Sequence, residues 1–253
     1  MGGKMQWCSD SSYKEDLLRR RYDPHVREIN EFVDRLREQH RDKFIPYVAP
    51  TYGGNNARML ALLSDPGPGT NPAMNGSELL CVENDDPTAA RYKMYIQRHG
   101  IDVCDLQAWN AFPWYVSPIG RYEPGRPKQY PESEVHGAIE ALAKMIDLMP
   151  NLRVVLLHGD VAKGAWEQLR ERRPASARKA RLVVGTYHTS ARLIRDKSPS
   201  RVRQVEGDLD NAFSRAAAGL RGSVGAPQGT QQTSTVRRTS AFVESPYSDE
   251  PPF

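Results

Sequence analysis

Short apolar segments that alternate with segments of helical periodicity constrain the fold of this chain more than any other feature. Four of them read as strands: "MLALL" at 59–63, the start of "CDLQAWNAFPWY" at 104–115, "RVVLLHGD" at 153–160 and "ARLVVGTYH" at 180–188. Each is nearly continuous in apolar residues, which is typical of strands buried on both faces of a parallel sheet. The pattern predicts an α/β fold, a three-layer α/β/α arrangement around a central four-stranded, mostly parallel sheet.

Helices are expected between these strands, from apolar periodicity and from capping residues. The clearest boundary is Asp86-Pro87, an N-cap residue followed by proline at the first helical position. The expected helical ranges are 24–41, 87–100, 132–149, 161–172 and 208–220.

Length and composition point to one sizeable globular domain. The chain has 253 residues, of which 39% are hydrophobic and 26% charged. We expect an N-terminal helical segment at 1–54 that packs on the core, the α/β domain at 55–220, and a disordered tail at 221–253, where apolar residues are few. No apolar run approaches the ~20 residues that span a bilayer, so we expect no membrane partner. We also expect a monomer, located in the cytoplasm with its thiols reduced.

The cysteines and acidic residues indicate no metal or other cofactor. Cys8, Cys81 and Cys104 are widely spaced and form no CxxC pair, which argues against zinc and iron–sulfur sites and favours reduced thiols. The acid run at 83–86 could suggest magnesium, but Asp86 is already accounted for as a helix cap. The net charge of +4 is compatible with a polyanionic partner without requiring one.

Polar residues follow the predicted strands, and in a parallel sheet ligands bind beyond the carboxyl ends of the strands. The segments "SDPGPGT", "WNAFPWY", "HGD" and "YHTS" should therefore converge. The first is not a nucleotide-binding P-loop, because no Gly-Lys-Ser/Thr follows its glycines. A carboxylate at such a rigid turn, Asp65, is suited to positioning a water molecule or an electron-poor centre. Asp65 could equally cap the turn.

Two further strand-end residues carry useful chemistry. Asn110 offers both a donor and an acceptor, which reading the edge of a nucleobase requires, although it could instead satisfy loop backbone groups. His188 directly follows the fourth strand, where a histidine facing an acid and an amide is a better catalytic candidate than an isolated one. Together the three residues predict a catalytic or binding site at this edge.

With these residues assembled, the chain resembles the uracil-DNA glycosylase superfamily over about residues 55–215. "SDPGPGTN" resembles its water-activating motif, "WNAFPW" its base-reading strand and "HTSARL" its His-Pro-Ser motif with the leucine wedge. A weaker match is "LLHGDVAKGAW", which is similar to the family's strand followed by a helix start. The matches occur in the family's order.

The resemblance implies a role for each matched residue. Asp65 would orient a water toward C1′ of a flipped-out nucleotide and stabilise the sugar cation, and His188 would donate to the O2 side of the departing base. Asn110 would bind the 3,4 edge of the base. The remaining implied contacts are Pro66, Gly67 and Leu80 (or Leu79) around the base, Thr70 and Ser190 at phosphates, and Arg192 or Leu193 as the wedge.

Departures from the motifs imply a branch outside the strict uracil enzymes. Those carry a tyrosine after Asp-Pro that blocks the C5 side of the base, where this chain has Gly67. Leu80 stands where an aromatic usually stacks on the base, and Thr189 replaces the proline of His-Pro-Ser. The resemblance thus implies a monofunctional, metal-independent DNA glycosylase for a deaminated or C5-modified pyrimidine, acting in repair or in defence against phage DNA with hypermodified cytosine.

Two other readings remain open. A scaffold of this superfamily could bind uracil-containing or modified DNA without cleaving it, although the presence of Asp65, Asn110 and His188 argues against this. A metal-dependent hydrolase could use the acid run at 83–86, and activity that survives EDTA would exclude it. An amide can be flipped to read either a carbonyl or an amino group, so Asn110 leaves the identity of the base open.

Overall fold

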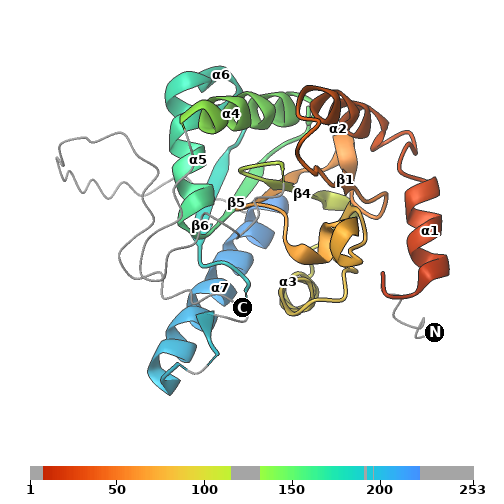
Figure 1. Cartoon of the computed structure of the whole chain (residues 1–253). Coiled ribbons are helices and arrows are strands. Elements are labelled where there is room, and N and C mark those ends of the chain that lie inside the picture. The colour runs from red at the N-terminus through yellow and green to blue at the C-terminus, as the bar shows by residue number, and fades with distance from the viewer. Residues whose placement is uncertain (1–7, 115–131, 191–192, 196, 223–253) are drawn as a thin grey trace.

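The computed structural model describes residues 8–114, 132–190, 193–195 and 197–222 of the chain. They form a three-layer α/β/α fold around a four-stranded, all-parallel sheet, as the sequence predicts (Figure 1). The strands are β2 (Met59–Leu63), β4 (Leu106–Asn110), β5 (Val154–His158) and β6 (Leu182–Thr186), in the spatial order β4-β2-β5-β6.

Helices cover both faces of the sheet (Figure 1). The longer ones are α2 (Arg27–Gln39), α3 (Pro87–Arg98), α4 (Glu132–Asp147), α5 (Gly159–Arg172) and α7 (Pro199–Leu220). Helices α4 and α5 pack on one face and α3 and α7 on the other, so β2, β4 and β5 are buried almost throughout, whereas the edge strand β6 is partly exposed. That double burial explains why the strand segments carry almost no polar residues.

The order of the strands creates a topological switch point between the central strands β2 and β5. From β2 the chain passes through α3 to β4 on one side, whereas from β5 it passes through α5 to β6 on the other. The connections of the neighbouring strands β2 and β5 therefore leave in opposite directions. In open parallel sheets this switch point, beyond the carboxyl ends of the strands, is where ligands bind.

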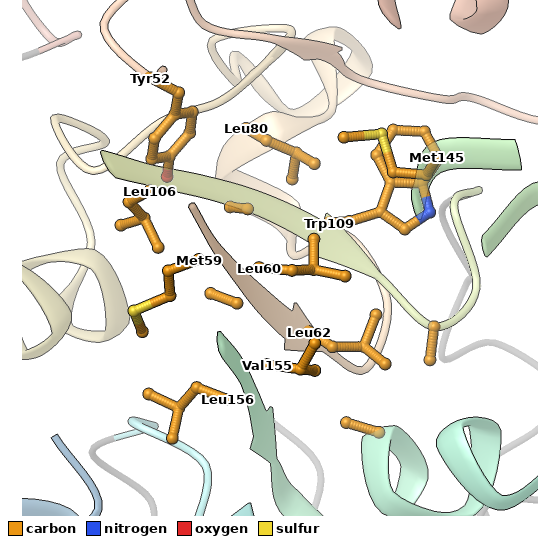
Figure 2. Packing of buried hydrophobic residues seen from close by; sticks show 14 of the residues in the cluster. Tyr52, Met59, Leu60, Leu62, Leu80, Leu106, Trp109, Met145, Val155 and Leu156 are labelled. Atoms are coloured by element: carbon orange, nitrogen blue, oxygen red, sulfur yellow. The ribbon is translucent and has the colours of Figure 1, made fainter. Parts of the chain in front are cut away.

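The N-terminal residues share the core of the α/β domain. Helix α1 (Ser11–Arg19) and α2 are followed by β1 (Tyr47–Val48), which pairs in parallel with β3 (Leu79–Leu80) in a separate two-stranded sheet. Leu17 of α1 and Ile29 of α2 are fully buried in the same hydrophobic cluster as β2. Figure 2 shows part of this cluster around β2, β4 and β5. The segment at 1–54 thus packs on the domain over the residues described.

Close packing of α7 on the sheet depends on a glycine. A β-carbon at Gly219 would lie 2.7 Å from Leu182 Cδ2 and 2.9 Å from Val154 Cγ2, well inside van der Waals contact. The missing side chain lets the end of α7 approach β5 and β6 directly.

The element boundaries differ from the sequence expectations at a few points. Helix α7 starts at Pro199, capped by the Ser198 side chain that accepts from the Arg201 backbone N–H, so the expected start at 208 was wrong by more than two turns. The missed signal is the Ser-Pro capping pair, which precedes the apolar periodicity. Helix α1, the short α6 (Pro174–Ala177) and the β1–β3 sheet were not expected. The tail predicted to be disordered lies outside the described residues, apart from 221–222.

Candidate functional site

Three of the residues singled out in the sequence lie at the carboxyl ends of the parallel strands: Asp65 after β2, Asn110 at the end of β4 and His188 after β6. Asn110 ends β4 and is in register with Leu63 of β2. The pairing continues past the strands, because the Ala111 N–H donates to the Leu63 carbonyl at 2.8 Å and Phe112 N–H to the Ser64 carbonyl at 2.9 Å. Asn110 is therefore held beside the residues that lead directly into Asp65.

His188 follows the strand on the other side of β5. That strand is β6, and a β-carbon placed on Gly159, the first residue of α5, would lie 3.6 Å from the Cβ of His188. Asp65 and His188 thus flank the end of β5 from the two neighbouring strands. One strand, β5, thus lies between the strand that leads into Asp65 and the strand that leads into His188.

Side chains along a strand alternate between the two faces of the sheet, and this alternation decides which face the candidate site residues project toward. His158 ends β5, and its ring packs on Tyr92 of α3 at 5.3 Å and on Phe213 of α7 at 5.8 Å between centroids. Residues in register across parallel strands project to the same face. By this rule Asn110 and Thr186 also project toward the face that α3 and α7 cover.

The amide of Asn110 is buried and incompletely paired. The residue is 2% exposed, and its Nδ2 forms no hydrogen bond with the residues that the structure describes. Leaving such a donor unsatisfied costs about 1–3 kcal/mol, so it is retained in folded proteins chiefly where a ligand or water completes it. The Nδ2 group of Asn110 is accordingly a donor that an acceptor atom of a water molecule or of a ligand would complete.

The Asp-Pro-Gly-Pro-Gly segment forms a fixed turn. Thr70 closes it, because its backbone N–H and its hydroxyl both donate to the Gly67 carbonyl, at 3.0 and 2.8 Å. Pro66 is buried and Asp65 is half-buried. Thr70, which was expected to contact a phosphate, is 5% exposed, and its hydroxyl donates its hydrogen bond to the turn itself. Its phosphate contact stays a prediction that this geometry does not favour.

Gly67 occupies an open position in that turn. Its backbone is extended, with φ −80° and ψ 168°, a conformation that every L-residue adopts, so the turn itself does not require glycine. A β-carbon built on it would meet nothing within 4 Å. A positive φ, a common reason for glycine in a turn, is therefore not the reason for glycine at this position.

The protonation of His188 is set by its backbone neighbour. The Ser190 N–H donates to His188 Nδ1 at 3.0 Å. A backbone amide can only donate, so Nδ1 is the unprotonated nitrogen and the neutral ring carries its proton on Nε2. His188 is thereby prepared as a hydrogen-bond donor through Nε2.

The neighbouring His158 is buried in its neutral form. Complete burial, and then the nearby ring of His188, lower the pKa of His158 to about 3. Its Nδ1 lies 3.4 Å from the Tyr187 carbonyl, and its Nε2 has no hydrogen-bond partner among the described residues. Tyr92 Oη is likewise buried without a described partner. Two buried polar atoms, Nε2 of His158 in β5 and Oη of Tyr92 in α3, therefore lie on the side of the sheet toward which Asn110 projects.

Two residues that sequence reasoning missed hold the loop of His188 in place. Arg91 of α3 donates through Nη1 to the carbonyls of Thr189 and Ser190, at 3.4 and 3.2 Å. Asp208 of α7 accepts from the Thr186 hydroxyl at 2.7 Å and from the Tyr187 N–H at 3.1 Å. Both contacts join residues far apart in the sequence, and no local pattern signals them.

Of the other residues expected to contact a ligand, the two leucines of β3 are buried, Leu193 is half-buried, and one residue is not described. Leu80 is 8% exposed and belongs to β3, and Leu79 is fully buried beside it. Leu193 is half-buried against the core, and Arg192 lies outside the described residues. Their roles in base stacking and as the wedge stay predictions.

Within the described ranges, no three His, Cys, Asp or Glu side chains come together in a way that could hold a metal ion. In the same ranges no helix is both long and apolar enough to cross a bilayer.

A scan of the chain against protein-family models finds no match, and a search of curated proteins finds no similar sequence. The interpretation of the site therefore depends on its own geometry and on the motifs.

Proposed function

We propose that the chain is a monofunctional DNA glycosylase that hydrolyses the N-glycosidic bond of a deaminated or C5-modified pyrimidine. The observation that carries the proposal is the position of Asp65, Asn110 and His188 at the carboxyl ends of β2, β4 and β6, with His188 accepting a backbone hydrogen bond at Nδ1 and so carrying the proton of its neutral ring on Nε2. In the reaction the C1′–N1 bond breaks, a water oxygen adds to C1′, and the base leaves with a proton, so that an abasic sugar remains.

Asp65 supplies the negative charge on the sugar side. As the bond breaks, positive charge develops on C1′ and the ring oxygen, and a nearby carboxylate stabilises it. The same carboxylate accepts a hydrogen bond from the attacking water and orients its lone pair toward C1′. The fixed turn closed by Thr70 supports this role, because it holds the carboxylate without burying it completely.

His188 stabilises the other half of the separating charge. The departing base accumulates negative charge on O2 and N1, and an Nε2–H donor aimed at O2 bonds this anion more strongly than the neutral base. A preorganised donor of this kind is worth about 10²–10³ in rate. The hydrogen bond from Ser190 supports the assignment, since it keeps the proton on the nitrogen that must donate.

Asn110 and Gly67 define the substrate class. The buried amide of Asn110 reads the hydrogen-bonding edge of the base, and the open space at Gly67 admits a substituent at C5. These two observations support a pyrimidine with an enlarged C5 group alongside plain uracil. Such a base arises through damage in cellular DNA or through deliberate modification in phage DNA, and repair and defence are the corresponding roles.

DNA is the proposed partner, because a pyrimidine nucleotide reaches such a site only after it is flipped out of the helix. The net charge of +4 supports contact with phosphates, and Ser190 and Leu193 lie on the loop beside His188, where phosphate and wedge contacts are needed. Binding should consequently weaken as salt is raised.

The test is incubation of the full chain with duplex and single-stranded oligonucleotides, each with one modified base, scored for abasic sites by alkaline cleavage. The panel holds uracil, thymine opposite guanine, 5-hydroxymethyluracil, 5-hydroxymethylcytosine and its glucosylated form. Asp65→Asn and His188→Gln should lower single-turnover excision at least 100-fold and leave DNA affinity within a few-fold. Glu167→Gln, on the exposed surface of α5, is the matched control.

Each outcome has a clear meaning. Excision that depends on Asp65 and His188 and survives EDTA supports the proposal. Selective binding of one modified duplex without excision would replace it by a DNA-binding module, and loss of all activity in EDTA would replace it by a metal-dependent hydrolase.

A further inference from the structure

Two cysteines that are 73 positions apart in the sequence meet in the fold. The Sγ atoms of Cys8 and Cys81 lie 3.8 Å apart, and both residues are buried, at 8% and 6% exposure. Cys8 precedes α1, whereas Cys81 directly follows β3. The two sulfur atoms are in van der Waals contact as free thiols, and a disulfide requires them to approach by about another 2 Å.

A carboxylate organises this pair. The Cys81 thiol donates to Glu83 Oε2 at 2.7 Å, and the Thr51 hydroxyl donates to the same oxygen at 3.2 Å. The Cys8 backbone N–H donates to the Glu83 carbonyl at 2.9 Å. Glu83 thus fixes the segments of both cysteines and provides a proton acceptor beside Cys81.

The two thiols differ in acidity. Burial is the main cause that raises the pKa of Cys81, and hydrogen bonding with Cys81 is the main cause that lowers the pKa of Cys8. The thiolate, which is the nucleophilic form of cysteine, therefore develops on Cys8 rather than on Cys81.

We propose that Cys8 and Cys81 form a redox-active dithiol that a small hydroperoxide converts to a disulfide. The Cys8 thiolate attacks the peroxide, breaks its O–O bond and becomes a sulfenic acid, while the other oxygen leaves as hydroxide and takes up a proton to become water. The Cys81 sulfur then attacks the Cys8 sulfur. Hydroxide is displaced, and it leaves as water with the Cys81 proton that Glu83 relays. In total two thiols and one hydrogen peroxide give one disulfide and two waters.

The bond would link the segment before α1 to the segment between β3 and α3. A cross-link between residues so far apart in the chain lowers the entropy of the unfolded state. We expect the oxidised protein to melt about 5 °C or more above the reduced one. This inference does not depend on the proposed DNA chemistry.

The experiment treats the full chain with hydrogen peroxide, alkylates the remaining thiols in denaturant and maps the digest by mass spectrometry. The expected result is a Cys8–Cys81 linked peptide, an intact-mass loss of two hydrogens that dithiothreitol reverses, and a raised melting temperature. Cys104→Ser should behave as wild type, since Cys104 lies apart from the pair.

Cys8→Ser and Cys81→Ser should abolish both the linked peptide and the rise in melting temperature. Should either variant fold poorly, the wild-type mapping alone decides the question. Oxidation confined to Cys104, or alkylation of Cys8 and Cys81 that peroxide leaves unchanged, would overturn the proposal.

Discussion

His158 should make the stability of this protein depend on pH in a calculable way. The folded pKa of about 3 lies below the ordinary value of 6.5, because burial disfavours the charged ring. Between pH 3 and 6.5 the unfolded chain therefore binds more protons at this residue than the folded chain does. It follows that the free energy of unfolding rises with pH across this window and is unaffected by His158 above it.

The size of the effect follows from the two pKa values. Relative to pH 7.5, the titration of His158 should lower the free energy of unfolding by about 2 kcal/mol at pH 5 and by about 3 kcal/mol at pH 4. Carboxylates titrate in the same range, so the contribution of His158 must be isolated with a variant. His158→Phe keeps a ring between Tyr92 and Phe213 and removes only the titration and the contact with Tyr187.

The assay is urea unfolding of both proteins at pH 7.5, 6, 5 and 4, followed by the fluorescence of the buried tryptophans Trp109, Trp114 and Trp166. The lost Tyr187 contact is an offset that does not vary with pH. The difference between wild type and His158→Phe should therefore shift by about 2 kcal/mol in favour of the variant from pH 7.5 to pH 5. His136→Gln, on the exposed side of α4, should follow wild type. Parallel pH curves for wild type and His158→Phe would refute the reasoning.

Three further predictions concern the site and are read against excision of the best substrate of the panel. Gly67→Tyr should fold normally, because the backbone at this position suits any residue and an added β-carbon meets nothing within 4 Å. The tyrosine ring should block substrates with a C5 substituent and leave excision of plain uracil much less affected. Loss of all substrates together with a lowered melting temperature would refute the idea that Gly67 controls access to the C5 side. Arg91→Met should slow excision about 10-fold or more with little change in DNA affinity, because the loop of His188 loses two hydrogen bonds from a charged group. Lys93→Met on the same helix is the control, and an equal loss of excision in both variants would mean that only the positive charge matters. Asp208→Ala should lower both the melting temperature and the rate of excision. Asp208→Asn should keep most of the wild-type melting temperature and rate, because the amide oxygen can still accept the hydrogen bonds from Thr186 and Tyr187. Equal losses in the two variants would show that the negative charge, and not the hydrogen bonding, is what matters.

The sequence by itself determined the fold class and the approximate positions of the four strands of the central sheet. Four apolar segments separated by helical periodicity, with Asp86-Pro87 as a cap, predicted a parallel α/β/α fold, and β2 spans the predicted residues 59–63. The capping prediction is confirmed, since Asp86 accepts from the N–H groups of Thr88 and Ala89. Strand positions and helix caps can be predicted from the sequence because they depend on apolar periodicity and on hydrogen bonds between residues that are neighbours in the chain.

The sequence also predicted which end of the sheet carries the candidate site residues, because every parallel strand ends at the same side of its sheet. That rule is sufficient to place Asp65, Asn110 and His188 at the same end of the sheet, as the structure does. It gives no information on the order β4-β2-β5-β6, which decides that β5 separates Asp65 from His188.

Only the tertiary structure decided what each side chain can do. The proton of His188 is located by a hydrogen bond from Ser190, the neutrality of His158 by burial under α3 and α7, and the openness at Gly67 by the path of the surrounding chain. The meeting of Cys8 with Cys81 likewise follows from the contact between the segment before α1 and the segment after β3. These properties arise from contacts between distant segments, and the physical reason they escape the sequence is that desolvation and long-range hydrogen bonds exist only once the layers have packed.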